Sequence, residues 1–326
     1  MNVPPVAVRR PGLRRWGITL TATAVSTYAL DAFATAAGAF GATLLSDSVD
    51  AHDALIFLAG ANVGAAVYEY GLARLTRHFL GRRYASFDDD WVAAEYLADY
   101  YAEVEPNEIE TIAFFVDAMR NTEPGVPVLL FGVGPTLHHV FLAAPHASEL
   151  HLADYLPDNL REIERWLERE PGAHDWRPFV RYTLQCEGVP DPTGEQVAER
   201  EEHTRAKVTR LLQVDARRPI RVDEPYATVI SAYCADSATG DRATWETFMA
   251  HIAGLVRPGG VFVTSALRRC RHYVVGGKRF PCADVDEDDL RAVLERRFER
   301  ATVEWREVAD HAAQGYSGIV LAWAYG

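Results

Sequence analysis

Short apolar runs alternate with amphipathic segments along the chain after about residue 82. A short apolar run bounded by glycine or polar residues is typical of a buried strand, and apolar residues at i, i+3 and i+7 are typical of one helix face. Leu160, Ile163 and Leu167 follow the helical spacing. The pattern predicts strands at 126–131, 149–154, 179–185, 227–232, 261–265, 301–307 and 318–324, helices at 137–144, 158–170, 243–255 and 286–297, and a polar excursion at 189–206 that ends in a helix.

This alternation predicts an α/β fold with a mostly parallel sheet that has helices on both faces. In such folds ligands bind beyond the carboxyl ends of the strands. Residues 82–103 are predicted to be a linker that leads into a helix. The acidic segment Ser86–Trp91 suits a helix N-terminus, and the aromatic segment Glu95–Tyr101 follows at helical spacing.

The N-terminal part of the chain has a different pattern. Residues 17–45 carry one formal charge, Asp31, and residues 54–68 carry none. Arginines flank this pair of segments, and three aspartates lie in the connector 46–53. Two apolar segments with basic outer ends and an acidic connector are typical of a membrane hairpin whose ends both lie in the cytoplasm.

We therefore predict a hydrophobic helical hairpin at residues 1–82, anchored in a membrane through residues 17–80, and a separate cytoplasmic domain at 83–326. The alternative is a helical cap on a soluble cytoplasmic protein. A charge-free run shorter than the ~20 residues of a typical span favours this alternative. So do Asp31 and Glu69, which are costly in lipid unless they are paired or face the bundle interior.

Composition limits the classes of partner and ligand. The net charge of −13 argues against a nucleic-acid partner, because contacts with phosphates supply most of that affinity. Cys186, Cys234, Cys270 and Cys282 lack the spacing of a zinc site, so we predict no metal centre there and expect reduced thiols.

A glycine turn follows the first predicted strand. Gly132 and Gly134 precede Thr136 and the next helix, and glycine lets a ligand approach the backbone closely. Asp154 closes the second strand, where an acid can accept hydrogen bonds from ribose hydroxyls. Leu137 stands where a dinucleotide-binding turn has its third glycine, which favours S-adenosylmethionine (SAM) over a dinucleotide. A strand-to-helix turn without a ligand is the alternative.

At these residues the chain resembles the nicotinamide, phenylethanolamine and thioether/indolethylamine N-methyltransferase family, over about residues 87–323. The most specific blocks are Gly134–Thr136 and Ala153–Trp176, and Glu95–Tyr101 and Leu255–Val263 also match. The resemblance implies a class I methyltransferase fold, with a Rossmann-like, seven-stranded, mostly parallel sheet. It also implies SAM as the cofactor and a small-molecule methyl acceptor, with nitrogen as the expected methylated atom.

The resemblance further implies which residues hold SAM. The glycines lie along the methionine part of SAM, and an acid and an amide hold its ribose. A loop aspartate and its neighbour border the adenine, and two tyrosines close over the methionine end. These residues are Gly132, Gly134, Thr136, Asp154, Asn159, Asp215, Ala216, Tyr96 and Tyr101. Without the resemblance, the tyrosines also suit an aromatic core stripe, and Asp215 also suits a solvated loop.

On the acceptor side the chain departs from the family's pattern. A family tyrosine is replaced by His138 or its neighbour His139, and a family acid at the end of the fifth strand is replaced by Ser265. Tyr273 matches a substrate-side tyrosine. Arg268 begins a basic stretch that suits an anionic acceptor, a lipid phosphate or a solvated turn. We expect acceptor contacts from His138, Ser265, Arg268 and Tyr273.

Methyl transfer from a sulfonium is an in-line displacement, so the enzyme chiefly supplies alignment, which contributes up to about 7–11 kcal/mol in model reactions. We assign no nucleophile, general base or metal, because a neutral amine need not lose a proton before attack. Two other functions stay open. One is methylation of a lipid-soluble, oxygen or sulfur acceptor at a membrane, and the other is a non-catalytic scaffold that binds SAM.

Overall fold

The computed structural model describes residues 84–308 and 315–326. They belong to one compact unit, Arg82–Gly326. The predicted hairpin of residues 1–82, with its membrane segment 17–80, lies outside the described residues. Within the described ranges, no helix is long and apolar enough to cross a membrane.

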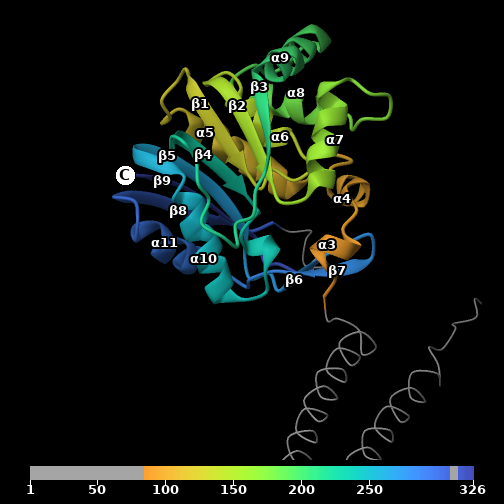
Figure 1. Cartoon of the computed structure of the whole chain (residues 1–326). Helices are drawn as coiled ribbons and strands as arrows, with labels where there is room; N and C mark the ends of the chain where they lie inside the picture. Colours follow the sequence, from red (N-terminus) through yellow and green to blue (C-terminus); the bar gives the residue numbers. More distant parts are fainter. Residues whose placement is uncertain (1–83, 309–314) are drawn as a thin grey trace, which may run out of the picture. The chain divides into compact units, whose positions relative to one another are not determined.

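A seven-stranded sheet forms the centre of this unit, in the order β3-β2-β1-β4-β5-β9-β8 (Figure 1). Neighbouring strands from β3 to β5 pair in parallel, whereas β9 pairs antiparallel with both β5 and β8. The predicted mostly parallel, seven-stranded sheet is confirmed. The strands are β1 Val126–Phe131, β2 Ala147–Asp154, β3 Val208–Gln213, β4 Tyr226–Ala232, β5 Val256–Leu267, β8 Arg300–Arg306 and β9 Ile319–Tyr325.

Helices cover both faces of the sheet (Figure 1). Successive side chains of a strand point to opposite faces. In β1, Val128 and Leu130 therefore pack into one core, and Leu129 and Phe131 pack into the other. The first core lies under α5 Pro106–Met119, α6 His138–Ala143, α7 Pro157–Leu167, α8 Arg177–Cys186 and α9 Gly194–Lys207, and the second lies under α10 Arg242–Ala253 and α11 Glu287–Glu295.

A cap lies beyond the carboxyl ends of the parallel strands (Figure 1). Aromatic contacts join its parts, because Phe87 and Trp91 pack against Phe280 with ring centroids 5.0 and 5.3 Å apart. The Tyr100 hydroxyl adds a hydrogen bond of 2.9 Å to the Val274 carbonyl. The cap consists of α3 Phe87–Asp90, α4 Ala93–Tyr100 and the antiparallel hairpin of β6 His272–Val275 and β7 Lys278–Pro281.

The strand predicted at 179–185 is wrong, because this segment is the helix α8. Phe179 and Val180 are buried together with Thr183 and Leu184, and this pairwise repeat every four residues is the spacing of a helix. A short apolar run does not by itself distinguish a strand from a buried helix.

The third strand of the parallel set is β3, which the hydrophobic pattern did not reveal. It lies at the edge of the sheet and none of its residues is fully buried, so it lacks the apolar run of the central strands. The helix α5 and the cap hairpin were missed as well. The other predicted strands and helices are present, with ends shifted by up to several residues.

Candidate active site

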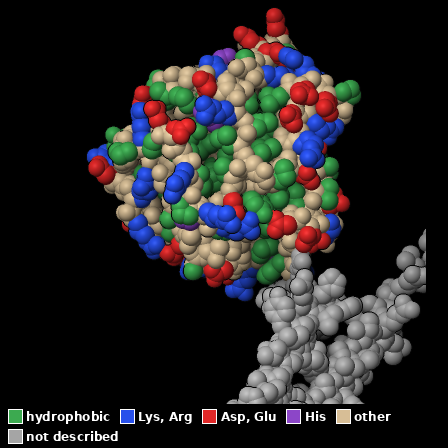
Figure 2. Space-filling model, in the orientation of Figure 1, with side chains coloured by type: hydrophobic (Ala, Val, Ile, Leu, Met, Phe, Trp, Pro, Cys, Tyr) green, Lys and Arg blue, Asp and Glu red, His purple; other side chains and the backbone are tan. Residues whose placement is uncertain are grey.

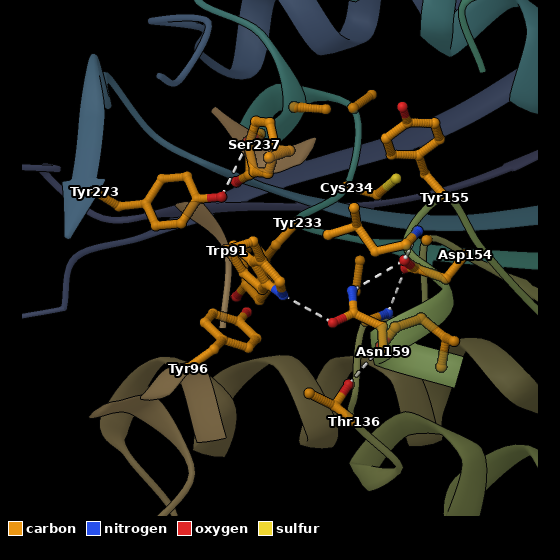
Figure 3. Close-up of a pocket in the computed structure, with 18 of the residues that line it drawn as sticks. Trp91, Tyr96, Thr136, Asp154, Tyr155, Asn159, Tyr233, Cys234, Ser237 and Tyr273 are labelled. Atoms are coloured by element: carbon orange, nitrogen blue, oxygen red, sulfur yellow. Dashed lines mark hydrogen bonds between the residues drawn. The ribbon is translucent and has the colours of Figure 1, made fainter. Parts of the chain in front are cut away.

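A cavity of about 490 Å³ opens at the carboxyl ends of the strands, between the sheet and the cap (Figure 3). Its size is within the range of small-molecule sites. Residues from the glycine turn, from the end of β2, from the loop after β4 and from the cap line it. The location is the one predicted for an α/β fold of this kind.

The glycine turn forms one wall of the cavity from bare backbone. Gly132 and Gly134 have positive φ angles of 65° and 64°, a conformation that other residues rarely adopt. A Cβ atom on Gly132 would lie 2.0 Å from the Sγ of Cys234. The Thr136 hydroxyl closes the turn with a hydrogen bond of 2.6 Å to the Val133 carbonyl. The turn thus needs glycine for both conformation and space.

Asp154 is buried beside this turn at the end of β2. Its carboxylate accepts hydrogen bonds from the backbone N–H of Gly134 at 2.8 Å, the N–H of Leu156 at 2.9 Å and the side-chain amide of Asn159 at 2.9 Å. Burial raises the pKa of Asp154, and these hydrogen bonds oppose the rise in part. The carboxylate is therefore held rigidly against the cavity that it lines.

Asn159 connects this acid to the cap. Its side-chain oxygen accepts a hydrogen bond of 2.8 Å from the indole N–H of Trp91 (Figure 3). Trp91 in turn packs against Tyr96, with ring centroids 4.9 Å apart. In the sequence Trp91 marks only the start of a helix, and nothing local indicates that its side chain reaches a residue 68 positions away.

Tyr96 and Tyr101, the two tyrosines expected over the methionine end, both line the cavity. Their hydroxyl oxygens lie 3.3 Å apart, and burial raises the pKa of both phenols above the ordinary value. Tyr101 also packs against Trp176 and Phe179 in the core. Both interpretations of these tyrosines therefore hold. The pair lines the cavity, and Tyr101 is also part of the aromatic core.

Asp215 and Ala216 lie at the rim of the cavity. A hydrogen bond from Arg217 lowers the pKa of Asp215. The guanidinium of Arg217 lies 4.6 Å from the ring centroid of Tyr155, which also lines the cavity. An aromatic ring, a guanidinium and a carboxylate thus meet at this rim.

Of the four residues expected to contact the acceptor, two line the cavity. These are His138 and Tyr273, whose hydroxyl donates a hydrogen bond of 3.2 Å to the Ser237 carbonyl. Ser265 is buried in β5 and Arg268 is paired with Glu287, and the lining contains neither.

The basic stretch that begins at Arg268 is neutralised by neighbouring acids. Arg269 pairs with Asp286, and Arg271 pairs with Asp284. With Arg268 also paired, each of these three arginines has a carboxylate partner. The basic stretch consequently gives no support to an anionic acceptor.

The cavity wall also contains an acid that the sequence patterns did not reveal, Glu108 of α5. Its carboxylate lies between His138 and His139, with side chains that are at most 7% exposed. Burial raises the pKa of Glu108, but the two histidines lower it more strongly, to below its ordinary value. Burial lowers the pKa of His139 to about 4. No local motif marks Glu108, because its partners lie in another helix.

The sheet order, the glycine turn after β1 and the acid after β2 together define a class I, SAM-dependent methyltransferase. The model of the NNMT/PNMT/TEMT family matches residues 81–324, and the chain belongs to this family. It is an enzyme of the transferase class that uses SAM as its cofactor.

Curated relatives include N-methyltransferases of three kinds. The chain is similar to indolethylamine N-methyltransferase of Mus musculus, with 32% identity over 220 residues, covering 64% of this chain and 82% of the relative. It is similar to phenylethanolamine N-methyltransferase of Macaca mulatta, with 30% identity over 210 residues, covering 61% and 73%. It is also similar to nicotinamide N-methyltransferase of Sus scrofa, with 30% identity over 193 residues, covering 58% and 70%.

The residues of the cavity fit SAM. Gly132 and Gly134 bring backbone without a side chain to the cavity wall, which suits close approach of a ligand. The buried carboxylate of Asp154 lines the cavity, and a carboxylate can accept hydrogen bonds from sugar hydroxyls. The tyrosines of α4 and its C-terminus present aromatic rings, which attract a sulfonium cation through their faces.

Proposed function

We propose that the protein transfers the methyl group of SAM to a nitrogen atom of a small aromatic or heteroaromatic acceptor. One observation carries this proposal: the cofactor turn and an aromatic wall line the same cavity. Trp91, Tyr96, Tyr233 and Tyr273 contribute to that wall (Figure 3). Aromatic side chains favour flat apolar ligands, because they offer large contact areas and stacking geometries.

Within this proposal, the cofactor residues keep the roles that the family resemblance implies. Gly132, Gly134 and Thr136 border the methionine part, with Tyr96 and Tyr101 closing over it. The position of all five residues in the cavity lining supports these roles.

The nucleoside part has its own set of residues. Asp154 and Asn159 hold the ribose, and Asp215 and Ala216 border the adenine. The hydrogen-bond network around Asp154 supports the first pair, because it orients both side chains before any ligand binds. The place of Asp215 at the rim supports the second pair.

The chemical step needs little from the side chains beyond position and exclusion of water. SAM supplies an activated methyl group when it is bound. Tyr96, expected over the methionine end, and Tyr273, expected on the acceptor side, both line the cavity, and their phenols stay protonated because burial raises both pKa values. A nitrogen acceptor attacks with its lone pair, so no side chain has to remove a proton first.

We also propose that this activity resides in residues 83–326 and that residues 17–80 hold the chain at a membrane. The support for the domain boundary is the compact unit that begins at Arg82. The support for the anchor is the charge pattern of the sequence alone. Fractionation of cells expressing the full chain tests the anchor: recovery with membranes after carbonate washing is expected, and recovery in the supernatant without detergent would contradict it.

A turnover assay tests the proposed reaction. The full chain is incubated with SAM and a panel of aromatic amines, pyridines, phenols and thiols, and formation of S-adenosylhomocysteine is measured. Turnover with a nitrogen acceptor, and methyl-nitrogen product by mass spectrometry, is expected. Turnover with phenols or thiols alone would show another acceptor class, and SAM binding without any turnover would favour a scaffold.

A further inference from the structure

Glu108, His138 and His139 form a cluster in the wall of the cavity. Glu108 lies in the first turn of α5, and the two histidines begin α6. The Oε2 atom of Glu108 lies 3.0 Å from the Nε2 of His138 and 3.5 Å from the Nε2 of His139. One donor atom from each of the three residues lies within 4.8 Å of the other two. All three side chains are buried and line the cavity.

The contacts within this cluster are short but are not aligned as hydrogen bonds. In the part of the chain that the structure describes, neither Glu108 Oε2, nor His138 Nε2, nor His139 Nε2 has a hydrogen-bond partner. A buried polar atom left in this state costs about 1–3 kcal/mol. The three atoms approach each other without pointing at each other, and a shared partner between them would satisfy all three.

A metal ion has the size that this arrangement requires. Atoms bound tetrahedrally to one Zn²⁺ at ~2.0–2.2 Å lie ~3.3–3.6 Å from each other. The Oε2–Nε2 separation of 3.5 Å falls in that range, and the separation of 3.0 Å lies slightly below it. The second oxygen of Glu108 accepts a hydrogen bond from the side-chain amide of Asn107, a support of the kind that holds metal-binding carboxylates in place.

We propose that Glu108, His138 and His139 bind one divalent transition-metal ion. Two imidazoles and one carboxylate suit Zn²⁺, Co²⁺ or Fe²⁺, whereas Mg²⁺ and Ca²⁺ prefer oxygen ligands only. Three protein ligands leave coordination positions open, and since all three residues line the cavity, a donor atom of a small molecule bound there can occupy one.

Neighbouring aromatic rings hold the ligands in position. The ring of His138 stacks on Trp176 at an interplanar angle of 16° and contacts Tyr101 at 4.8 Å between centroids. His139 contacts Phe115 at 4.8 Å. The site is independent of the proposed reaction, because methyl transfer from SAM to a neutral amine needs no metal.

Metal binding to the full chain tests this proposal. The protein, free of affinity tags, is treated with a chelator and dialysed, and binding of Co²⁺ and Zn²⁺ is measured by visible absorption and by calorimetry. One ion per chain is expected for the wild type. Glu108→Gln and His139→Ala are each expected to weaken binding at least about tenfold, since even residues that only support metal ligands contribute that much.

The control is His203→Ala, which removes an exposed imidazole outside the cluster. Binding by this variant is expected to equal that of the wild type. A wild type that binds no more metal than the Glu108→Gln variant would overturn the proposal. If the cluster variants fail to fold, X-ray absorption of the Co²⁺-loaded wild type decides: two imidazole nitrogens are expected, and sulfur ligands would overturn the proposal.

Discussion

Gly132 illustrates how closely the backbone of the glycine turn is packed. Its φ angle is +65°, and a Cβ atom there would meet the Sγ of Cys234 at 2.0 Å. Gly125 has a similar φ of +74°, but nothing lies within 4 Å of its Cβ position. An alanine at either glycine strains the backbone, but only an alanine at Gly132 also causes a steric clash. A comparison of the two substitutions therefore separates these two free-energy costs.

We predict that Gly132→Ala lowers the free energy of unfolding by about 1–3 kcal/mol more than Gly125→Ala, because only the first adds an overpacked contact. Urea unfolding of both variants measures the difference. Gly132→Ala is also expected to lose SAM binding, while Gly125→Ala keeps it. Equal losses of stability would show that the contact with Cys234 relaxes freely.

Asp236 is a buried acid just after β4. Burial raises its pKa to about 6, although the Leu267 N–H donates a hydrogen bond of 2.9 Å to its carboxylate. The folded state thus binds a proton more tightly than the unfolded state. The resulting stability is full below the unfolded pKa of about 4 and is lost as the pH rises through about 6.

We therefore predict that Asp236→Asn flattens the pH dependence of stability between about pH 4 and pH 7. The wild type is expected to lose up to about 3 kcal/mol relative to the variant over this interval, at about 1.4 kcal/mol per pKa unit. Chemical denaturation at several pH values measures it, with the exposed Asp117→Asn as control. Parallel curves for the wild type and Asp236→Asn would contradict the prediction.

At the scale of elements, the cap and the sheet meet through the Trp91–Asn159 hydrogen bond. Trp91 lies between α3 and α4, and Asn159 lies in the first turn of α7. The bond connects the aromatic wall to the acid of β2. The indole N–H of Trp91 is thus one neutral donor that links the cap to the residues around Asp154.

We predict that Trp91→Phe weakens SAM binding by about 2–10-fold, the loss expected for a neutral hydrogen bond of about 0.5–1.5 kcal/mol. Phenylalanine keeps an aromatic ring but has no N–H. The control is Trp305→Phe, at a tryptophan that is 44% exposed and lies in β8. Unchanged affinity in Trp91→Phe would show that the cap does not orient Asn159 through this bond.

Elements with strong local signals were predictable from the sequence, and elements formed by distant contacts were not. The strand β1, the glycine turn and Asp154 all follow from short patterns. The segment 179–185 resembles a strand in the sequence because its apolar run is short. Its helical period shows only in which residues the folded chain buries. Trp91 and Glu108 escaped notice since their partners lie in other elements.

At the scale of the whole molecule, the negative net charge and the family membership are both consistent with an enzyme that acts on a small molecule. The net charge is −13, and Lys and Arg side chains are interspersed with Asp and Glu over the face in Figure 2. A surface of this kind lacks the concentrated positive charge that nucleic acids require. The match to the NNMT/PNMT/TEMT family covers residues 81–324, whereas the predicted anchor precedes it.

Because the proposed cofactor site centres on Asp154, calorimetric binding of SAM is the decisive measurement. Wild-type protein is expected to bind one SAM per chain, and Asp154→Ala is expected to bind it at least about tenfold more weakly, because a hydrogen bond to a charged group contributes about 1.5–3 kcal/mol. The exposed Asp158→Ala, in the same region, is expected to bind like the wild type. Folded wild-type protein that binds no SAM, or an Asp154→Ala variant that binds it equally well, would contradict the account.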